Sequence, residues 1–180
     1  EPITLVNVSK NDVSCFDAND GSIFNTLVIG GTAPYDYIWT DTSNVVYNEP
    51  NPSSLSPSLY SLNIVDLNNC GVFLTNIEIN EPDLVQLLDN SIINQPTCND
   101  FNDGYIEVYA SGGTPSYIYN LTDSSGNIFT SNIVSDLSPG TYNLSIFDEN
   151  NCSFDSIITF INPIELEFST SIIDLSCYES

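Results

Sequence analysis

The sequence contains no histidine and no methionine, and its only basic residue is Lys10. Against this one positive charge stand 24 acidic residues, which give a formal net charge of -23. Binding of nucleic acid or of an anionic membrane surface depends on lysine and arginine, so the composition excludes both classes of partner. An acidic surface of this kind suits divalent cations, and it also keeps a crowded external array soluble.

Long apolar runs and helical patterns are missing as well. No stretch is apolar for long enough to insert directly into a membrane as a helix, and no signal peptide is recognisable. No capped apolar stripe with a helical period occurs. The chain also has no G-x-S-x-G turn and no repeated carboxylate pair in apolar surroundings. We therefore expect a protein that is not an enzyme.

What the sequence does contain is a tandem repeat. The stretch LSPSLYSLNIVDLNNC (residues 55–70) returns 82 positions later as LSPGTYNLSIFDENNC (residues 137–152), with 10 of 16 residues identical. Two upstream stretches, CFDANDGSI and GGTAPYDYIW, return as CNDFNDGYI and GGTPSYIYNL. Such a fixed period predicts repeated modules. Proline markers place them at residues 1–81, 82–162 and 163–180, the last being the start of a third module in a longer polypeptide.

Alternation of apolar and polar residues predicts short strands in each module. A strand at residues 22–29 has Ile23, Leu27 and Ile29 on one face, and a Gly-Gly turn follows it. A weaker strand is expected at residues 44–48, before a loose polar region that leads to residue 55. The second module repeats the first alternation with Ile106, Val108 and Ala110, and the weaker strand at residues 127–131.

These strands and their turns predict an all-β fold made of tandem immunoglobulin-like antiparallel β-sandwich modules. Trp39 falls on the third strand, where such sandwiches bury a tryptophan. Tyr60 and Tyr142 each follow a Leu-Ser-Pro turn and open the next-to-last long strand, which is the position of a tyrosine corner. The repeated sixteen residues are thus interpreted as structural.

The cysteines recur at repeat positions, which indicates disulfides in an oxidising, extracellular place. If four strands separate Cys15 from Cys70, the two share one end of the sandwich, and Cys15–Cys70 and Cys98–Cys152 close each module internally. This simpler scheme is our first expectation. If five strands separate them, they lie at opposite ends, too far apart for a bond that needs Cα atoms within about 7 Å. Cys15 then pairs with Cys152 across the junction, and Cys70, Cys98 and Cys177 are left for other modules.

The motif D-x-N-D-G occurs twice and is the best candidate for a bound ligand. Calcium takes six to eight oxygen ligands, which Asp and Asn around a Gly can supply, although the distal Glu of an EF-hand is missing. The alternative is a turn in which the same side chains cap the backbone. Both interpretations stay open, and no other cofactor is expected. The candidate ligands are Asp17, Asn19, Asp20, Asp100, Asn102 and Asp103, with Asp66 and Asp148 as extra ligands.

The ordered set of motifs, CFDANDGSI, GGTAPYDYIW, L-S-x-G-x-Y and D-x-N-N-C, resembles the SprB-type repeat of very large cell-surface adhesins of gliding and other Bacteroidota. The resemblance covers both complete modules and, through SIIDLSC, the start of the third. Ser58 stands where the pattern has Gly. Ser116 and Leu121 stand where it has Pro and Trp, so module 2 is expected to pack its core around a smaller side chain.

The resemblance implies a secreted, surface-anchored filament, exported by the type IX system, in which the repeats act as a stalk. In gliding species such an adhesin moves along the cell surface. The implied partners are neighbouring repeats and a surface ligand or glycan. Ser156, in a motif similar to an O-glycosylation motif of Bacteroidota, is a candidate acceptor.

A second functional hypothesis is a carbohydrate- or protein-binding module of a secreted protein. Its stacking platforms would be aromatic side chains on the third strand of each module, provided that these rings are exposed to solvent. The residues concerned are Tyr35, Tyr37, Tyr117 and Tyr119.

Overall fold

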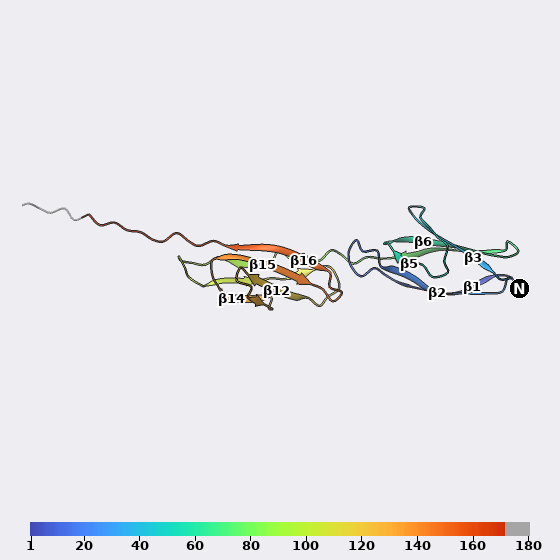
Figure 1. Cartoon of the computed structure of the whole chain (residues 1–180), viewed down its shortest axis with the longest axis horizontal. Coiled ribbons are helices and arrows are strands. Elements are labelled where there is room, and N and C mark those ends of the chain that lie inside the picture. Colours follow the sequence, from blue (N-terminus) through green and yellow to red (C-terminus); the bar gives the residue numbers. More distant parts are fainter. Residues whose placement is uncertain (172–180) are drawn as a thin grey trace, which may run out of the picture.

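The computed structural model describes residues 1–171 of the chain, and the regular structure in this part consists of strands alone. Two groups of strands, within residues 4–79 and 86–160, lie end to end along the long axis of the molecule (Figure 1). We call them module 1 and module 2. The N-terminus lies at the outer end of module 1, and the segment that follows module 2 leaves from the opposite end (Figure 1).

Module 1 is a sandwich of two antiparallel sheets. One sheet has the strand order β1-β2-β5 and the other has the order β4-β3-β6-β7. The strands are β1 (Thr4–Asn11), β2 (Gly21–Ile29), β3 (Tyr35–Asp41), β4 (Val46–Tyr47), β5 (Ser53–Leu55), β6 (Ser58–Asp66) and β7 (Gly71–Ile79).

Module 2 repeats this plan with a less regular first sheet. Its four-stranded sheet has the order β13-β12-β15-β16, while the opposing layer is divided into β14-β10-β9 and β11-β8. The strands are β8 (Gln86–Leu87), β9 (Ile92–Asn94), β10 (Gly104–Glu107), β11 (Ala110–Ser111), β12 (Ile118–Asp123), β13 (Ile128–Phe129), β14 (Ile133–Leu137), β15 (Gly140–Phe147) and β16 (Ser153–Phe160). The chain is therefore all-β, with tandem immunoglobulin-like sandwiches.

Each module has its own hydrophobic core between its sheets. Trp39 is fully buried in module 1, and Leu121 is fully buried at the equivalent place in module 2. The smaller leucine is accompanied by Phe160, which replaces Ile79 at the end of the last strand. The Phe160 ring meets the Tyr142 ring edge to face, with centroids 5.5 Å apart. Module 2 thus fills its core with a different pair of side chains.

The sequence predicted the buried face of β2 correctly only for the first residues of the strand. Ile23 is buried, but Leu27 and Ile29 are 52% and 54% exposed. Asn25 has a φ of 56°, and the pairing of β1 with β2 shifts register on either side of Asn7. A bulge of this kind moves all later side chains to the opposite face of the strand. Module 2 keeps the expected alternation, because Ile106 and Val108 are both fully buried.

The polar region before residue 55 contains a strand that the sequence pattern did not reveal. β5 pairs with β2, and its last residue, Leu55, is fully buried. With β4 from the predicted weak strand, five strands separate Cys15 from Cys70, namely β2 to β6. An odd number of passes takes the chain from one end of module 1 to the other.

Candidate functional site

Residues 1–171 contain one disulfide, and it lies at the junction between the two modules. Cys15 is bonded to Cys152, with 5.6 Å between the Cα atoms and 137 residues between them in sequence. The internal pairs that we expected first, Cys15–Cys70 and Cys98–Cys152, are therefore wrong. Their error follows from the strand count, because five passes place Cys15 at the junction and Cys70 at the far end of module 1. Among residues 1–171, Cys70 and Cys98 are unpaired and exposed.

Cys15 is held at the junction by a turn that follows β1. Ala18 N–H donates to the carbonyl of Cys15, and Ser14 N–H donates to Asp20 Oδ1 at 2.9 Å. The hydrogen bonds from Ser14 hold the pKa of Asp20 below its ordinary value. Asp17 N–H donates to Glu81 Oε2 at 2.8 Å. This last bond ties the cysteine turn to the segment that connects the modules.

Cys152 is held from the other side by a buried carboxylate. Asp148 Oδ1 accepts N–H bonds from Asn150 and Cys152, at 2.9 and 2.8 Å. Its Oδ2 accepts the N–H of Thr114 at 2.7 Å. Charge-assisted bonds of this kind are stronger than neutral ones. The aspartate thus joins the loop of Cys152, the second or trailing cysteine of its module, to the turn after β11.

Further contacts cross the junction beside the disulfide. The Asn150 side chain donates to the backbone carbonyl of Ser14 at 3.1 Å and to Thr114 Oγ1 at the same distance. A hollow of about 180 Å³ adjoins the sulfur atoms, and Phe16, Leu84 and Val85 contribute to its walls. The two modules are therefore joined by a covalent bond, a side-chain hydrogen bond and a short chain segment.

The predicted calcium ligands do not gather into one cluster. Asn19 Oδ1 accepts the Ser56 hydroxyl, and Asp20 caps the backbone as described above. In module 2, Asp103 accepts both the N–H and the hydroxyl of Thr97, and these bonds lower its pKa. The Asp100 carboxylate accepts a hydrogen bond from the side-chain amide of Asn162, and Asn102 is exposed. The hydrogen bonds are those of the turn interpretation, and calcium binding stays a prediction.

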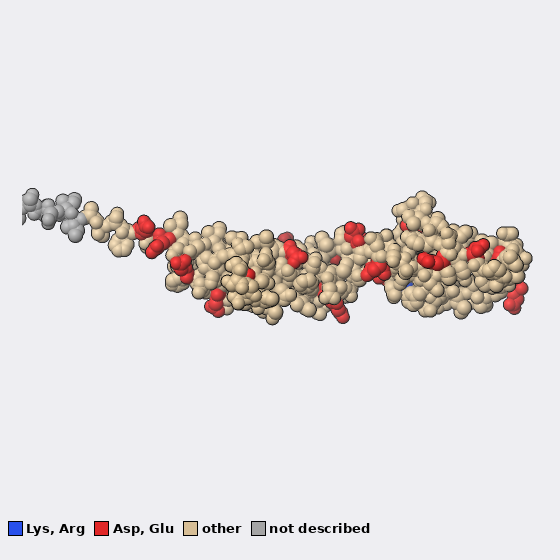
Figure 2. Space-filling model, viewed as in Figure 1, with Lys and Arg blue, Asp and Glu red and all other residues tan. Residues whose placement is uncertain are grey.

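Asp66 and Asp148, the predicted extra ligands, lie away from these loops or point elsewhere. Asp66 is at the outer end of module 1, where it accepts N–H bonds from Thr32, Asn68 and Cys70. Asp148 lies near the junction, but its oxygens are bound to backbone N–H groups. Nowhere within residues 1–171 do three or more His, Cys, Asp or Glu side chains come together as a metal site. Carboxylates are spread along both modules on the face that Figure 2 shows.

The predicted structural residues occupy core and corner positions. The Tyr60 hydroxyl donates to the carbonyl of Ser56 at 2.9 Å, and the Tyr142 hydroxyl donates to that of Ser138 at 3.0 Å. Both modules therefore contain a tyrosine corner. The Trp39 ring is buried, and its Nε1 has no hydrogen-bond partner among the described residues.

The tyrosines proposed as stacking platforms are half-buried against the cores. Tyr35 and Tyr117 each donate a 2.6 Å hydrogen bond to the carbonyl of the first glycine in the preceding turn. They support that turn and do not form a row of exposed rings. Ser156, the candidate glycosylation acceptor, is half-buried within β16, opposite Leu144.

Sequence reasoning missed the polar residues that close each module at its C-terminal end. Asn80 N–H donates to Asp12 Oδ1, and Ile161 N–H donates to Gln95 Oε1, both at 2.8 Å. Glu81 and Asn162 then cap the cysteine turns of their modules. The sequence does contain a signal for these caps, because an acidic or amide residue stands before both Pro82 and Pro163. In the sequence analysis the two prolines served only to mark the repeat period.

No helix among the described residues has the length and apolar character that crossing a bilayer requires. No curated protein matches the chain. Among solved structures, a C-terminal 282-residue fragment of intimin, crystallised in complex with the intimin-binding domain of the translocated intimin receptor, resembles it with a TM-score of 0.48 and 16% identity. The likeness covers 88% of this chain, and the chain spans 64% of that fragment.

Residues 7–44 and 90–126 match the SprB repeat family. The first matched segment begins within β1, and the second begins between β8 and β9. Each includes the first, or leading, cysteine of its module, the Gly-Gly turn and the long strand after that turn, which is β3 or β12. The repeat indicates a structural or adhesive region of an extracellular cell-surface protein. The chain therefore contains, in each of its two modules, one segment that is similar to the SprB repeat.

Proposed function

We propose that this chain is a stalk segment of a secreted bacterial cell-surface filament or adhesin. The observation that carries the proposal is the junction, where a disulfide and the Asn150–Ser14 hydrogen bond fix one module on the next. Each sandwich needs contacts only with its neighbours, so such an array can be lengthened by adding units. A stalk has to hold its modules in line, and this junction restrains bending.

Small-angle X-ray scattering tests the stalk. We expect the scattering of the oxidised chain to fit one elongated arrangement with the modules end to end. The double variant Cys15→Ser, Cys152→Ser should fit only a broader set of bent and straight arrangements, while its far-ultraviolet circular dichroism stays that of the parent. If the oxidised chain already requires a broad set of arrangements, the proposal of a semi-rigid stalk is wrong.

The proposal extends to location and to movement. Export by the type IX system and a role in surface gliding are supported only by the kind of protein in which this repeat occurs. An antibody raised against the chain tests the location on intact cells of the source bacterium. Labelling before lysis supports a surface filament, and labelling only after lysis contradicts it. Slower spreading of cells that lack the repeats, compared with cells that lack an unrelated surface protein, would support a part in gliding.

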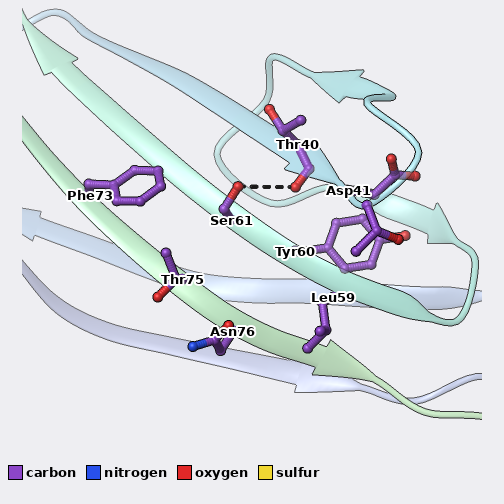
Figure 3. A pocket seen from close by; sticks show the side chains of 9 residues that line it. Thr40, Asp41, Leu59, Tyr60, Ser61, Phe73, Thr75 and Asn76 are labelled. Atoms are coloured by element: carbon purple, nitrogen blue, oxygen red, sulfur yellow. Dashed lines mark hydrogen bonds between the residues drawn. The ribbon is translucent and has the colours of Figure 1, made fainter.

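A second candidate function, glycan recognition, is favoured by a hollow on the outer face of the β3-β6-β7 layer in module 1. The hollow measures about 280 Å³ (Figure 3). Phe73 on β7 is 64% exposed beside it. Hydroxyl and amide groups of Ser61, Thr75 and Asn76 line it around this ring (Figure 3). An exposed aromatic face next to hydroxyl and amide groups is a combination that can stack on and hydrogen-bond to a sugar.

A glycan array distinguishes the two functions. A binding module should retain specific glycans, and Phe73→Ala should abolish the retention. Ile157→Ala, which removes an exposed apolar side chain from the corresponding layer of module 2, is the matched control. An array on which the parent chain binds nothing, or binds equally well after Phe73→Ala, would sink the recognition function.

A further inference from the structure

Cys70 and Cys98, the exposed cysteines within residues 1–171, occupy the same places in their modules as the two bonded ones. Cys98 follows the first strands of module 2 as Cys15 follows β1. Phe101 N–H donates to the Cys98 carbonyl as Ala18 N–H does to that of Cys15. The residue before each cysteine donates its N–H to an aspartate six positions on, at 2.9 Å in both modules. Cys98 is therefore presented at the outer end of module 2 as Cys15 is presented at the junction.

Cys70 is the counterpart of Cys152 in the same way. Asp66 Oδ1 accepts the N–H of Cys70 at 2.8 Å, and Asp148 Oδ1 accepts the N–H of Cys152 at 2.8 Å. In both modules the second oxygen of the aspartate holds the threonine after the Gly-Gly turn. Cys70 thus lies at the outer end of module 1, on the side that would face a preceding repeat.

An exposed apolar side chain also lies beside Cys98. Phe16 contributes to the hollow next to the bonded sulfur atoms, and its place in module 2 is taken by Asn99. The aromatic ring of that turn is Phe101, which is 57% exposed and takes the place of Ala18. Beyond Pro163, the alternating Leu166 and Phe168 correspond to Val85 and Leu87 beyond Pro82. Val85 is buried in module 2, whereas Leu166 is 92% exposed. A third sandwich built on this segment would bury these side chains.

We propose that Cys98 and Cys70 are half-sites of further inter-module disulfides, Cys98 with the trailing cysteine of a following SprB-type repeat and Cys70 with the leading cysteine of a preceding one. The inference rests on the proposed function, because it requires a tandem array. The observed bond between Cys15 and Cys152 is the pattern that both half-sites repeat. The partner is in each case a repeat of the same kind, recognised by its cysteine and by the apolar surface next to it.

Bond formation needs an electron acceptor, and a low-molecular-weight disulfide is the class of oxidant that serves. The Cys98 thiolate attacks one sulfur of this disulfide, which releases one small thiol and leaves a mixed disulfide. The thiolate of the partner cysteine then displaces the second small thiol. Two protein thiols are oxidised, one small disulfide is reduced to two thiols, and both protons leave to solvent or to the released thiolates.

In an array, each of these bonds joins two neighbouring modules, and the bonds together with the connecting chain segments form two interlaced covalent paths. A path enters a module at its trailing cysteine, follows the segment to the next leading cysteine, and then crosses to the trailing cysteine of the module beyond. The segment from Cys70 to Cys98 is such a connection. The chain between a leading and a trailing cysteine of one module lies outside the path and bears no load while the bonds hold.

An internal duplication of residues 83–163 within the full chain tests the proposal. It places a copy of module 2 directly after Pro163 and so supplies the following repeat with its own trailing cysteine. The copy carries Cys98→Ser and Ser153→Thr, so that the peptides around its cysteine positions differ in mass from those of the original module 2. The chain is refolded in a buffer of oxidised and reduced glutathione, alkylated and mapped without reduction. We expect a linked peptide that joins Cys98 to the copied Cys152, together with the original Cys15–Cys152 link, and the loss of Cys98 alkylation.

The matched control is the same duplication with Cys98→Ser in the original module 2 as well, in which the copied Cys152 should become alkylated. A second variant, Phe101→Ser, should lower the yield of the new link without affecting the Cys15–Cys152 link. If Cys98 stays fully alkylated while the Cys15–Cys152 link has formed, the proposal is overturned. An internal link between Cys98 and the uncopied Cys152 overturns it as well.

The outcome can be separated from that of the stalk proposal. If the chain forms the new disulfide but its scattering requires a broad set of bent arrangements, the proposal of further inter-module disulfides holds and the proposal of a semi-rigid stalk is wrong. If the scattering fits one straight arrangement but Cys98 stays unpaired, the stalk proposal holds and the proposal of further inter-module disulfides is wrong.

Discussion

Two aspartates decide where the trailing cysteines lie. Asp66 and Asp148 each accept three backbone N–H groups, one of which belongs to the cysteine four residues later. Both side chains are buried. A buried carboxylate is tolerated when its oxygens are bound to donors, and losing those donors is costly. The loop at each trailing cysteine thus depends on one carboxylate.

The pKa of Asp66 predicts how acid affects module 1. The N–H of Cys70, followed by those of Thr32 and Asn68, holds the pKa of the Asp66 carboxyl below its ordinary value. A depressed folded-state pKa gives stability that is present above the unfolded pKa of about 3.9 and is lost as the pH falls through the folded value. We expect the melting temperature to fall between pH 5 and pH 2, as carboxylates of this kind are protonated.

The variant Asp66→Asn tests this assignment. It should melt at a lower temperature than the parent at pH 7, and its melting temperature should change less between pH 7 and acid, as followed by circular dichroism. Glu49→Gln, at an exposed position, is the control and should keep the acid response of the parent. An equal acid response in Asp66→Asn and the parent would contradict the role of this carboxyl.

The tyrosine corners make a second prediction for single residues. Tyr60→Phe removes the hydroxyl that donates to the Ser56 carbonyl and leaves that half-buried group with one partner fewer. We expect a loss of about 0.5 to 1.5 kcal/mol in the free energy of unfolding, measured in urea. Tyr142→Phe should cost a similar amount, because its bond to Ser138 is equivalent. A loss no greater than that of Tyr37→Phe, elsewhere in the same module, would rule out the corner as a stabilising feature.

At the scale of elements, the two cores fill the same space with different side chains. Module 1 combines Trp39 with Ile79, whereas module 2 combines Leu121 with Phe160. Cores tolerate exchanges that conserve the total volume much better than single reductions in size. The large ring of β3 has therefore been replaced by a ring at the end of the last strand.

A core exchange in module 1 tests this compensation. Trp39→Leu should cost about 2 kcal/mol or more, since it leaves a cavity in a packed core. Adding Ile79→Phe should recover about 1 kcal/mol of that loss, because the two side chains are coupled through the shared core. Urea unfolding of both variants measures the difference. If Ile79→Phe destabilises the Trp39→Leu background further, the two positions do not compensate each other.

The D-x-N-D-G turns make a prediction for metal removal. Hydrogen bonds to Ser14 and Thr97 already engage Asp20 and Asp103, so the turns should keep their shape without a cation. We expect the melting temperature to be the same in the presence of a chelator and of millimolar calcium. A clear rise with calcium that Asp17→Asn abolishes would instead establish the calcium site that the motif predicts.

Local patterns in the sequence predicted the sandwiches but not the details that fix the junction. The tyrosine corners and the buried Trp39 follow from turn residues and alternation, which are short-range signals. The bulge at Asn25 and the short strand β5 depend on pairing with distant strands, and apart from Leu55 their residues are polar. Without β5 the strand count is even, and that one missing strand turned the expected disulfides into internal ones.

At the scale of the whole molecule, the disulfide makes a covalent shortcut past most of the chain. It closes a loop with a sequence separation of 137 residues. In the chain-entropy treatment, a loop of that size lowers the conformational entropy of the unfolded state by an amount that stabilises the folded state by about 5 kcal/mol. Force applied at the two ends passes from residue 15 to residue 152 through the sulfur atoms. The enclosed residues of both modules then carry no tension, which is the property expected of a stalk that is pulled from its ends.

Pulling single molecules of the full chain from its two termini measures this shortcut directly. The substitutions Cys70→Ser, Cys98→Ser and Cys177→Ser prevent other pairings. Since an extended chain spans at most about 3.3 to 3.6 Å per residue, we expect the fully stretched oxidised chain to be shorter than the reduced chain by about 450 to 490 Å. Equal extension with and without reductant would contradict a covalent link between Cys15 and Cys152, and with it the account of the junction as the place where force passes from one module to the next.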